Sequence, residues 1–343
     1  MKKHYITGSI DTAAGKVQQI STVWNNTDVW STIKVRWSVG RHDYKVKQGL
    51  YAVGVPDENS SIFVTANFKL SFDHLRRSLH GMNAWVLVLD TKGVNVWCAA
   101  GKGTFGTKEL VYRIRAHELE KIVSHRKVIV PQLGATGVAA HEVFSKTGFH
   151  VIYGPVRAAD IKAFVDAGFK ATPEMRQVAF PMKERAKLIP VELSYGKYYL
   201  LVIPALFFII SGLNSKGYSV DVAWINGGRA VVNLCAAYLA GCALTPLLLP
   251  WIPFKMFSIK GLLMGWIITA LLLYLNFLGG SIFEIISWFL ITGSLSSFLA
   301  MNFTGSSTFT SLSGVRKEMK FALPLQIGAA GLGLIGWIVT RFI

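Results

Sequence analysis

The spacing of apolar and polar residues divides the chain into two parts. In residues 1–197, short apolar runs alternate with mixed stretches, which is typical of an α/β domain. In residues 198–343, the apolar runs approach the roughly 20 residues that cross a bilayer. We therefore expect a soluble α/β domain at residues 1–180, a linker at 181–197 and an all-α transmembrane domain at 198–343.

Several segments of the first part have the pattern of strands. Residues 29–39 alternate between apolar and polar side chains, which predicts a half-buried strand. Ala84–Leu89 is a continuous apolar run, typical of a strand buried on both faces. Further strands are expected at Ser61–Ala66, Lys127–Val130 and His150–Tyr153, with helices at Asp73–His80, Thr107–Val123, Glu142–Thr147 and Ala158–Ala167. This order predicts a Rossmann-like fold, a mostly parallel sheet with helices on both faces.

The turns that follow four of these strands carry glycine, hydroxyl or amide groups. Ligands of such sheets bind beyond the carboxyl ends of the strands, and glycine lets the backbone approach a ligand closely. Four such turns on consecutive strands indicate a large cofactor. The candidate contact residues in these turns are Thr65, Asn67, Gly134, Thr136, Gly137 and Gly154.

Common nucleotide motifs do not account for these turns. Gly101–Gly106 has the spacing of a dinucleotide-binding loop, but Cys98 and the lack of a matching acidic residue argue against NAD. The G-x-x-x-x-G-K-S/T pattern of a phosphate loop is also missing from the sequence.

The second part predicts five membrane spans and an orientation. The apolar segments are Tyr198–Leu213, Ala230–Leu249, Gly261–Phe277, Ile282–Met301 and Phe321–Ile338. Lysine and arginine gather at one set of span ends, which the positive-inside rule assigns to the cytoplasm. We expect Glu284, the acidic residue in the spans, to reach water from its place near a segment end. Cys235 and Cys242, seven residues apart, are either small packing residues or a soft-metal relay, and we favour packing.

Composition and charge agree with a membrane protein whose first part faces the cytoplasm. Hydrophobic residues make up 52% of the chain, and the mean hydropathy is +0.40. The formal net charge is +17, of which +12 falls in residues 1–197. An anionic membrane face is the simplest partner for this charge, because no basic block or reading motif for nucleic acid accompanies it. Two lysines at the N-terminus without an apolar stretch behind them do not form a secretory signal, so a multi-pass protein of the cytoplasmic (inner) membrane is expected.

Cys98 is the residue on which the functional interpretation depends. It follows an apolar strand and opens a glycine-rich turn within Asn95–Gly103. Three roles are open from the residues alone: a nucleophile paired with one of eight histidines, a buried structural thiol, or an axial ligand to a macrocyclic cobalt or iron.

The residues around Cys98 resemble a known signature. Asn95-Val-Trp-Cys-Ala-Ala-Gly-Lys102 matches at every position the N-(V/I)-W-C-A-(A/G)-G-K pattern of the HgcA family, the corrinoid proteins of anaerobic mercury methylation. The order of a corrinoid domain and about five spans is also similar. Val64–Ser71 and Gln132–Ala135 resemble segments of the corrinoid domain in the corrinoid iron–sulfur protein of the acetyl-CoA pathway.

The resemblance implies a cofactor and a reaction. A cobalamin-type corrinoid would bind with its own benzimidazole displaced (benzimidazole-off), and Cys98 would be the lower axial ligand to cobalt. A segment that caps the lower face of the ring would comprise Asn95, Val96, Trp97, Cys98, Ala99, Gly101 and Lys102. The implied reaction is corrinoid-dependent methyl transfer from methyl-Co(III) to Hg(II), which forms methylmercury.

The resemblance also implies partners and leaves alternatives. The methyl group would come from a methyl-tetrahydrofolate-linked donor, and the ferredoxin-like iron–sulfur protein HgcB would be the electron donor. One alternative is a membrane-anchored corrinoid methyl carrier for a metabolic acceptor related to the acetyl-CoA pathway. Another is a non-enzymatic membrane protein whose soluble domain binds a ligand. Delivery of mercury through the spans by Cys235 and Cys242 is a further hypothesis.

Overall fold

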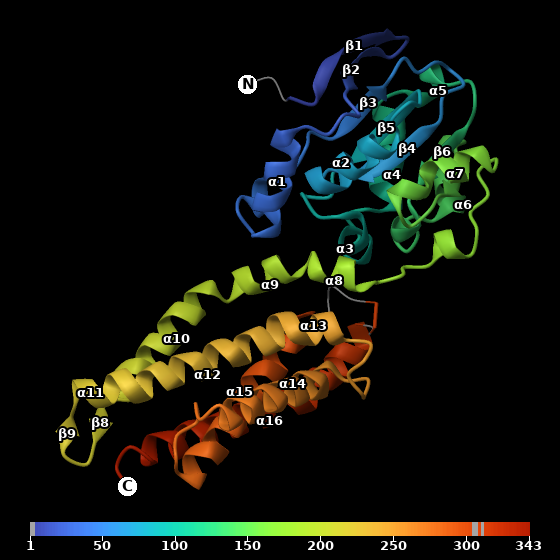
Figure 1. The fold of residues 1–343 in the computed structure, drawn as a ribbon. Coiled ribbons are helices and arrows are strands. Elements are labelled where there is room, and N and C mark those ends of the chain that lie inside the picture. Colours follow the sequence, from blue (N-terminus) through green and yellow to red (C-terminus); the bar gives the residue numbers. More distant parts are fainter. Residues whose placement is uncertain (1–3, 304–307, 310–311) are drawn as a thin grey trace. The chain divides into compact units, whose positions relative to one another are not determined.

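The computed structural model describes residues 4–303, 308–309 and 312–343, so the two N-terminal lysines lie outside the described residues. The chain forms two compact units (Figure 1). The first comprises residues 1–35 and 39–179, and the second comprises residues 36–38 and 180–343. An α/β domain thus comes first in the chain, and a helical region with several apolar helices follows it.

The first unit is built on a seven-stranded sheet with the order β1-β2-β3-β5-β4-β6-β7. β5, β4, β6 and β7 run parallel to one another, β3 is antiparallel to β5, and the β1–β2 hairpin joins through a parallel pairing of β2 with β3. The strands are β1 Ile6–Thr12, β2 Gly15–Ile20, β3 Gly49–Val53, β4 Ile62–Ala66, β5 Ala84–Leu89, β6 Lys127–Val130 and β7 His150–Tyr153. The expected strands from residue 61 onward are confirmed; β1, β2 and β3 were not expected.

Helices cover both faces of this sheet, as the continuous apolar strands predict. Every residue of β3, β4 and β5 is buried. On one face, Phe72 of α2 and Phe164 of α7 pack on the strands. On the other face, α3, α4 and α6 contribute Ala99, Leu110 and Val143. The helices of this unit are α1 Asn26–Arg36, α2 Lys69–Ser78, α3 Val96–Gly101, α4 Thr107–Ala116, α5 Leu119–Ile122, α6 Ala140–Thr147 and α7 Ile161–Asp166. Short turns of helix lie at η1 Arg41–Asp43, η2 Gln132–Gly134, η3 Ala158–Asp160 and η4 Glu174–Arg176.

The strand expected over residues 29–39 is wrong, because this segment forms helix α1 and the turn after it. Polar contacts at the helix start override the alternating pattern. The amide of Asp28 donates to Asn25 Oδ1 at 3.0 Å, and the amide of Asn25 donates to Asp28 Oδ2 at 3.2 Å. This reciprocal pair is a helix-capping arrangement, and it places Asp28, fully buried, against Arg76 and Lys69.

One expected helix is interrupted. The segment Thr107–Val123 divides into α4 and α5 at His117 and Glu118. Glu118 has a φ of 44°, a left-handed conformation that no continuous α-helix contains.

The second unit consists mainly of apolar helices. Four helical segments are long and apolar enough to cross a membrane, and Met182–Tyr195 together with Lys197–Ile210, a pair bent by 57°, would be a fifth. The elements are α8 Met182–Ala186, α9 Ile189–Tyr195, α10 Lys197–Ile210, the hairpin β8 Leu213–Asn214 and β9 Gly217–Tyr218, and α11 Val220–Val222. They continue with the π-helical turns η5 Ala223–Gly227 and η6 Ala240–Leu244 on either side of α12 Gly228–Leu239, then α13 Thr245–Leu248, α14 Phe257–Tyr274, α15 Ile282–Asn302 and α16 Leu312–Val339. The segment expected as a linker, 181–197, is largely helical, since α8 and α9 lie in it.

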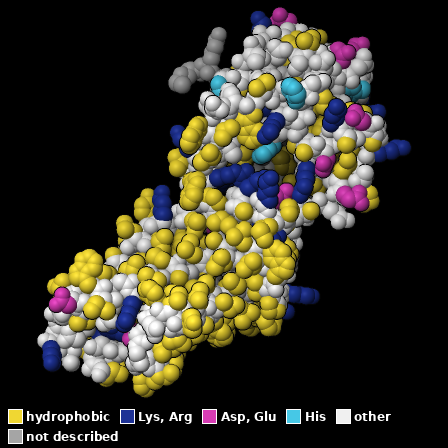
Figure 2. Space-filling model, viewed as in Figure 1, with side chains coloured by type: hydrophobic (Ala, Val, Ile, Leu, Met, Phe, Trp, Pro, Cys, Tyr) yellow, Lys and Arg dark blue, Asp and Glu magenta, His cyan; other side chains and the backbone are white. Residues whose placement is uncertain are grey.

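The surface and the charged residues of this unit fit a bilayer. Figure 2 shows a broad apolar surface on the second unit, with charged side chains toward its ends. Glu284, which was expected to reach water, instead pairs with Arg341, and both side chains are largely buried. Lys260 is buried and donates from Nζ to the carbonyls of Leu249 and Ile252 at 2.5 and 2.9 Å. These three largely buried charges near span ends are therefore paired or hydrogen-bonded within the protein.

Candidate functional site

The turns singled out in the sequence lie along one edge of the sheet. β5, β4, β6 and β7 are parallel neighbours, so Asp90, Asn67, Pro131 and Gly154 follow directly from strand ends on the same side. We call this side, formed by the C-terminal ends of these four strands, the carboxyl edge. The expectation that four strand ends meet there is confirmed for the described strands.

Cys98 lies on α3, the short helix that follows the turn after β5. Asn95 caps this helix: its Oδ1 accepts the amide of Cys98 at 2.9 Å, and its Nδ2 lies 3.5 Å from Cys98 Sγ. Val96, Ala99 and Ala100 are buried beneath the helix, while Trp97 is 38% exposed and Cys98 is exposed. The helix therefore turns its alanines inward and presents the thiol to solvent. This excludes the buried structural thiol, and no described histidine hydrogen-bonds Cys98 as a nucleophilic pair would require.

The loop that follows α3 is held against the turn after β6. Gly103 adopts a φ of 78°, and the amides of Thr104 and Phe105 both donate to the carbonyl of Ala99, at 3.0 and 3.1 Å. Phe105 is fully buried, and a Cβ at Gly134 would lie 2.4 Å from its ring. A Cβ at Gly137 would lie 2.1 Å from the carbonyl oxygen of Phe105. Glycine at 134 and 137 is thus required for this loop packing. Phe105 was not singled out in the sequence, although the glycines that pack against it were a signal that could have indicated its position.

Asn67 holds the turn after β5 in place. It is buried, and its Oδ1 accepts the amides of Thr91 and Gly93 and the hydroxyl of Thr91, all within 3.1 Å. Its Nδ2 donates to Asp90 Oδ1 at 3.1 Å. Thr65 is buried in β4 as well, at 3% exposure. These two residues lie within the fold beneath the carboxyl edge, where Asn67 positions the segment that leads to Cys98.

Other candidate residues of the carboxyl edge are more open. Gly101, Lys102 and Thr136 are exposed, and a Cβ at Gly101 would meet no atom within 4 Å. Gly154 is buried against Ile129, whose Cγ2 would lie 3.0 Å from an added Cβ. Gln132, in η2 against which α3 packs, has a buried Oε1 without a hydrogen-bond partner. A buried acceptor needs a hydrogen-bond partner, which a water molecule, an ion or a ligand could supply.

This donor set fits one class of metal cofactor. No group of three or more His, Cys, Asp and Glu residues that could hold a bare metal ion is present among the described residues. A metal within a macrocycle needs only one protein ligand below the ring, since the ring supplies the equatorial nitrogens. The exposed Cys98 thiol, the open surface at Gly101 and the unpaired Gln132 acceptor fit such a group.

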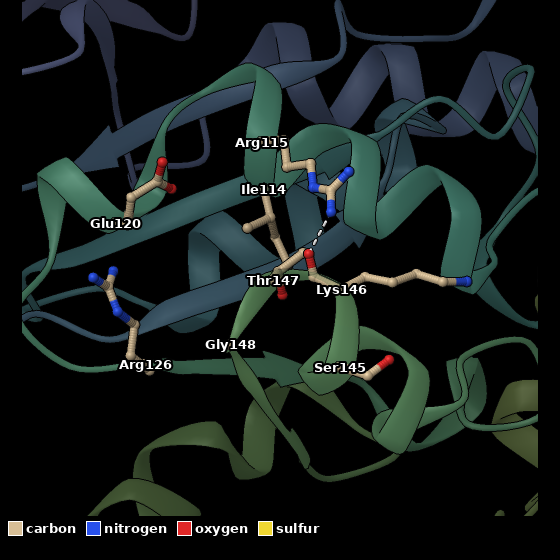
Figure 3. A pocket seen from close by; sticks show the side chains of 8 residues that line it. All are labelled: Ile114, Arg115, Glu120, Arg126, Ser145, Lys146, Thr147 and Gly148. Carbon is tan, nitrogen blue, oxygen red and sulfur yellow. Dashed lines mark hydrogen bonds between the residues drawn. The ribbon is translucent and has the colours of Figure 1, made fainter.

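Two cavities of the first unit lie away from Cys98. One, of about 410 Å³, is lined by residues near the starts of β6 and β7, which we call the amino edge (Figure 3). There Arg115 donates to the carbonyl of Lys146 at 2.5 Å, and Arg126, Glu120 and Gly148 complete part of the wall. A second cavity, of about 490 Å³, lies beside Tyr112 on α4 and shares Arg115 and Lys146. Neither is lined by Cys98, whose side chain is exposed at the carboxyl edge.

Comparisons with known proteins match the first unit. Residues 30–165 match the family model of the CO dehydrogenase/acetyl-CoA synthase delta subunit. The acetyl-CoA decarbonylase/synthase complex subunit gamma of Archaeoglobus fulgidus is 30% identical over 143 residues, which cover 40% of this chain and 30% of that protein. The corrinoid/iron-sulfur protein large subunit of Moorella thermoacetica is 30% identical over 125 residues, covering 36% of this chain and 28% of that protein.

The match is partial on both sides. A gamma 2 subunit of the same complex from Methanosarcina thermophila is 33% identical over 115 residues, or 32% of this chain and 24% of that protein. This chain therefore spans less than a third of the length of these curated relatives. The family match, residues 30–165, covers the carboxyl edge and Cys98, and over 36–40% of its length the chain is similar to relatives that include a corrinoid/iron-sulfur subunit.

Proposed function

We propose that the first unit binds a corrinoid at the carboxyl edge, with Cys98 as the lower axial ligand to cobalt, and that the chain is a corrinoid-dependent methyltransferase. The observation that carries this proposal is the exposed Cys98 thiol on a capped helix, placed at the strand ends of a domain similar to part of a corrinoid/iron-sulfur protein. A bound corrinoid would supply a cobalt centre that accepts and releases a methyl group.

Residues around Cys98 would orient the thiol and form the protein surface beneath the ring. Asn95 fixes the backbone of Cys98 through its Oδ1 and offers its Nδ2 to the sulfur, which favours a thiolate ligand in one orientation. Trp97, partly exposed beside it, offers an apolar surface that would exclude water from the lower face. The open backbone at Gly101 would admit the ring edge, and Gln132 Oε1 would accept a hydrogen bond from one of the amide groups at the corrin periphery.

The proposal also specifies Hg(II) as the acceptor of the methyl group. The eight-residue match at Asn95–Lys102 supports Hg(II) as substrate and methylmercury as product. A thiolate below the cobalt would donate charge, which favours transfer of a carbanion equivalent to an electrophilic metal ion. A metabolic acceptor related to the acetyl-CoA pathway is the second candidate, favoured by the decarbonylase/synthase subunits among the relatives.

Partners and location complete the proposal. The chain has three cysteines, too few to bind iron–sulfur clusters of its own. We therefore infer a separate reductant, the ferredoxin-like iron–sulfur protein HgcB, and a methyl-tetrahydrofolate-linked methyl donor. The four or five apolar helices would anchor the chain in the cytoplasmic membrane, with the first unit on the cytoplasmic side.

One set of measurements on the purified chain tests cofactor and acceptor separately. After anaerobic loading with a corrinoid, the cobalt absorption spectrum is expected to change on Cys98→Ala and to stay the same on the matched control Cys235→Ala. A chain that remains colourless after loading would contradict both corrinoid functions. A loaded chain that, with reductant and methyl donor, forms no methylmercury from Hg(II) would favour the metabolic acceptor.

A further inference from the structure

Helix α1 has its polar and apolar sides reversed with respect to the domain that carries it. The side that faces the protein holds Asp28, which is fully buried and bonded to Arg76 at 2.8 Å and Lys69 at 3.2 Å. Ser31 adds a 2.8 Å hydrogen bond to the hydroxyl of Tyr44. The helix is therefore attached to the protein by ionic and hydrogen-bonded contacts together with one fully buried apolar side chain, Val35.

The outward side of α1 holds the large apolar residues. Val29, Trp30 and Ile33 are 47%, 63% and 42% exposed. They share one face of the helix because their positions are three and four residues apart. In the turn that follows, Val39 of the same unit is 59% exposed. We call these four residues the α1 apolar face. An exposed set of large apolar side chains of this kind, with a tryptophan among them, indicates an interaction surface.

The charges around the α1 apolar face are mainly positive. Between Ala13 and Lys47 the acidic residues are Asp28, whose carboxylate is buried, and Asp43, which is exposed. Lys34 lies exposed on the helix itself, and Lys45 and Lys47 lie exposed shortly after it. The surface thus combines tryptophan with lysine, the pair of residue types that segments lying in a membrane interface use.

We propose that the α1 apolar face lies in the headgroup layer of an anionic membrane, the same bilayer that the apolar helices of the second unit cross. Two observations favour a membrane over a protein partner. The chain carries four or five helices able to span a bilayer, which hold a membrane surface at high local concentration. The exposed charges beside the face are mainly positive, with Lys34, Lys45 and Lys47 against the single carboxylate of Asp43, which complements anionic lipid headgroups. Membrane contact would fix the first unit through a second attachment besides the chain connection.

The experiment uses the full chain in nanodiscs that contain anionic lipid. Cys98, Cys235 and Cys242 are replaced by alanine, and a spin label is attached at Trp30→Cys or, as a matched control, at Tyr112→Cys on α4, where the native side chain is similarly exposed at 59%. Oxygen, which concentrates in lipid, and a water-soluble nickel complex then compete to relax each label. The label at position 30 is expected to show an oxygen-to-nickel accessibility ratio several times that of the label at position 112.

Two outcomes would overturn the proposal. Equal ratios at the two positions would place the α1 apolar face in water. A label at position 30 shielded from both reagents would mean that protein covers the face, either another copy or another part of the chain. Lys34→Glu is expected to lower the ratio at position 30 in anionic discs; an unchanged ratio would remove the role of charge.

A second measurement avoids the cysteine replacements. Hydrogen exchange of the segment 24–40 in the unmodified chain is expected to slow in anionic discs relative to neutral ones, whereas a segment in α4 exchanges equally in both. Equal exchange of residues 24–40 in both discs would contradict the proposal. Neither measurement requires corrinoid, reductant or methyl donor. A negative result would therefore contradict the membrane contact of α1 without contradicting the proposed function.

Discussion

The two edges of the sheet in the first unit differ in what they offer a ligand. The amino edge has a cavity of about 410 Å³ with Arg115, Arg126 and Lys146 around it. At the carboxyl edge, loops pack tightly on one another and one thiol is exposed to solvent. The cavity directs attention to the amino edge, whereas the chemistry of the residues favours the carboxyl edge.

A site for a large flat cofactor therefore need not be a pocket before the cofactor binds. A macrocycle brings its own equatorial ligands and most of its own surface, so the protein needs a rigid floor with one correctly placed donor atom. The carboxyl edge provides rigidity through Asn67, Gly134 and Gly137, which hold the turns in fixed positions. Substitutions at this edge can be compared with matched substitutions elsewhere, mainly at the amino edge.

The largest effect is expected from removal of the thiol. Cys98→Ala should lower methyl transfer by more than about 100-fold, the upper range for the loss of even an outer partner of a metal ligand. Arg115→Ala together with Arg126→Ala at the amino edge should change the rate by less than about twofold, since surface changes away from a site are nearly neutral. Methyl transfer by corrinoid-loaded protein is the measurement. A stronger loss from the arginine pair than from Cys98→Ala would reverse the assignment of the two edges.

Asn67 is expected to have the largest effect on stability. Asn67→Ala removes an acceptor of three hydrogen bonds beneath the turn after β5, and each buried group left unpaired costs about 1–3 kcal/mol. Asn83 is the matched residue at the other end of β5, where its exposed side chain accepts one amide, that of Val55, at 3.0 Å. Asn83→Ala should cost less than about 1 kcal/mol. Thermal unfolding of the two variants compares them, and equal losses would contradict the role given to Asn67.

Two substitutions at Asn95 distinguish its role as the N-cap of α3 from its contact with the sulfur of Cys98. Asn95→Ala loses both and should cost about 1 kcal/mol of stability, the usual value for an N-cap. Asn95→Asp keeps an acceptor for the amide of Cys98 but removes the Nδ2 donor near Sγ. Stability should therefore be recovered in the aspartate variant while the cobalt spectrum of loaded protein stays altered. A wild-type spectrum in Asn95→Asp would show that the Nδ2–Sγ contact does not matter.

The smallest expected effect is a pH dependence of the turn after β5. Burial raises the pKa of Asp90, but hydrogen bonds from Lys92 and Asn67 outweigh it and hold the pKa below its ordinary value. The folded state then binds fewer protons than the unfolded state, so the contribution of Asp90 is present above the unfolded pKa of about 3.9 and is lost as the pH falls through the folded pKa. Asp90→Asn should be less stable than wild type at pH 6, with the difference shrinking below pH 4, as thermal unfolding would reveal. A constant difference at all pH values would rule out this linkage.

The sequence predicted the part of the fold in which local pattern and tertiary environment agree. Ala84–Leu89, Lys127–Val130 and His150–Tyr153 are strands with the expected bounds, because a short apolar run between turns has little alternative to a buried strand. The β1–β2 hairpin could not be recognised, since its side chains are mostly polar and exposed. Helix α1 was mistaken for a strand because most of its apolar residues are exposed and only Val35 is buried, so their spacing carries little information about the core.

The candidate site was predictable in outline and less so in the roles of single residues. Strand order and parallel direction placed four turns at one edge, and the motif singled out Cys98. Thr65 and Asn67 were candidates for cofactor contact, but their side chains are buried within the fold, and only hydrogen bonds across the chain reveal this. Phe105 was missed because its importance comes from glycines 134 and 137, about thirty residues away in the sequence.

Because Cys98 is exposed, its thiol can be labelled selectively. Of the three cysteines, Cys242 is buried and Cys235 is partly covered, so a maleimide applied to the folded chain should alkylate Cys98 first. If the thiol coordinates a metal, occupancy blocks that alkylation, and the unlabelled fraction, read as intact mass, counts the loaded molecules. The same atom that would make the protein sensitive to oxygen thus permits its loading state to be counted molecule by molecule.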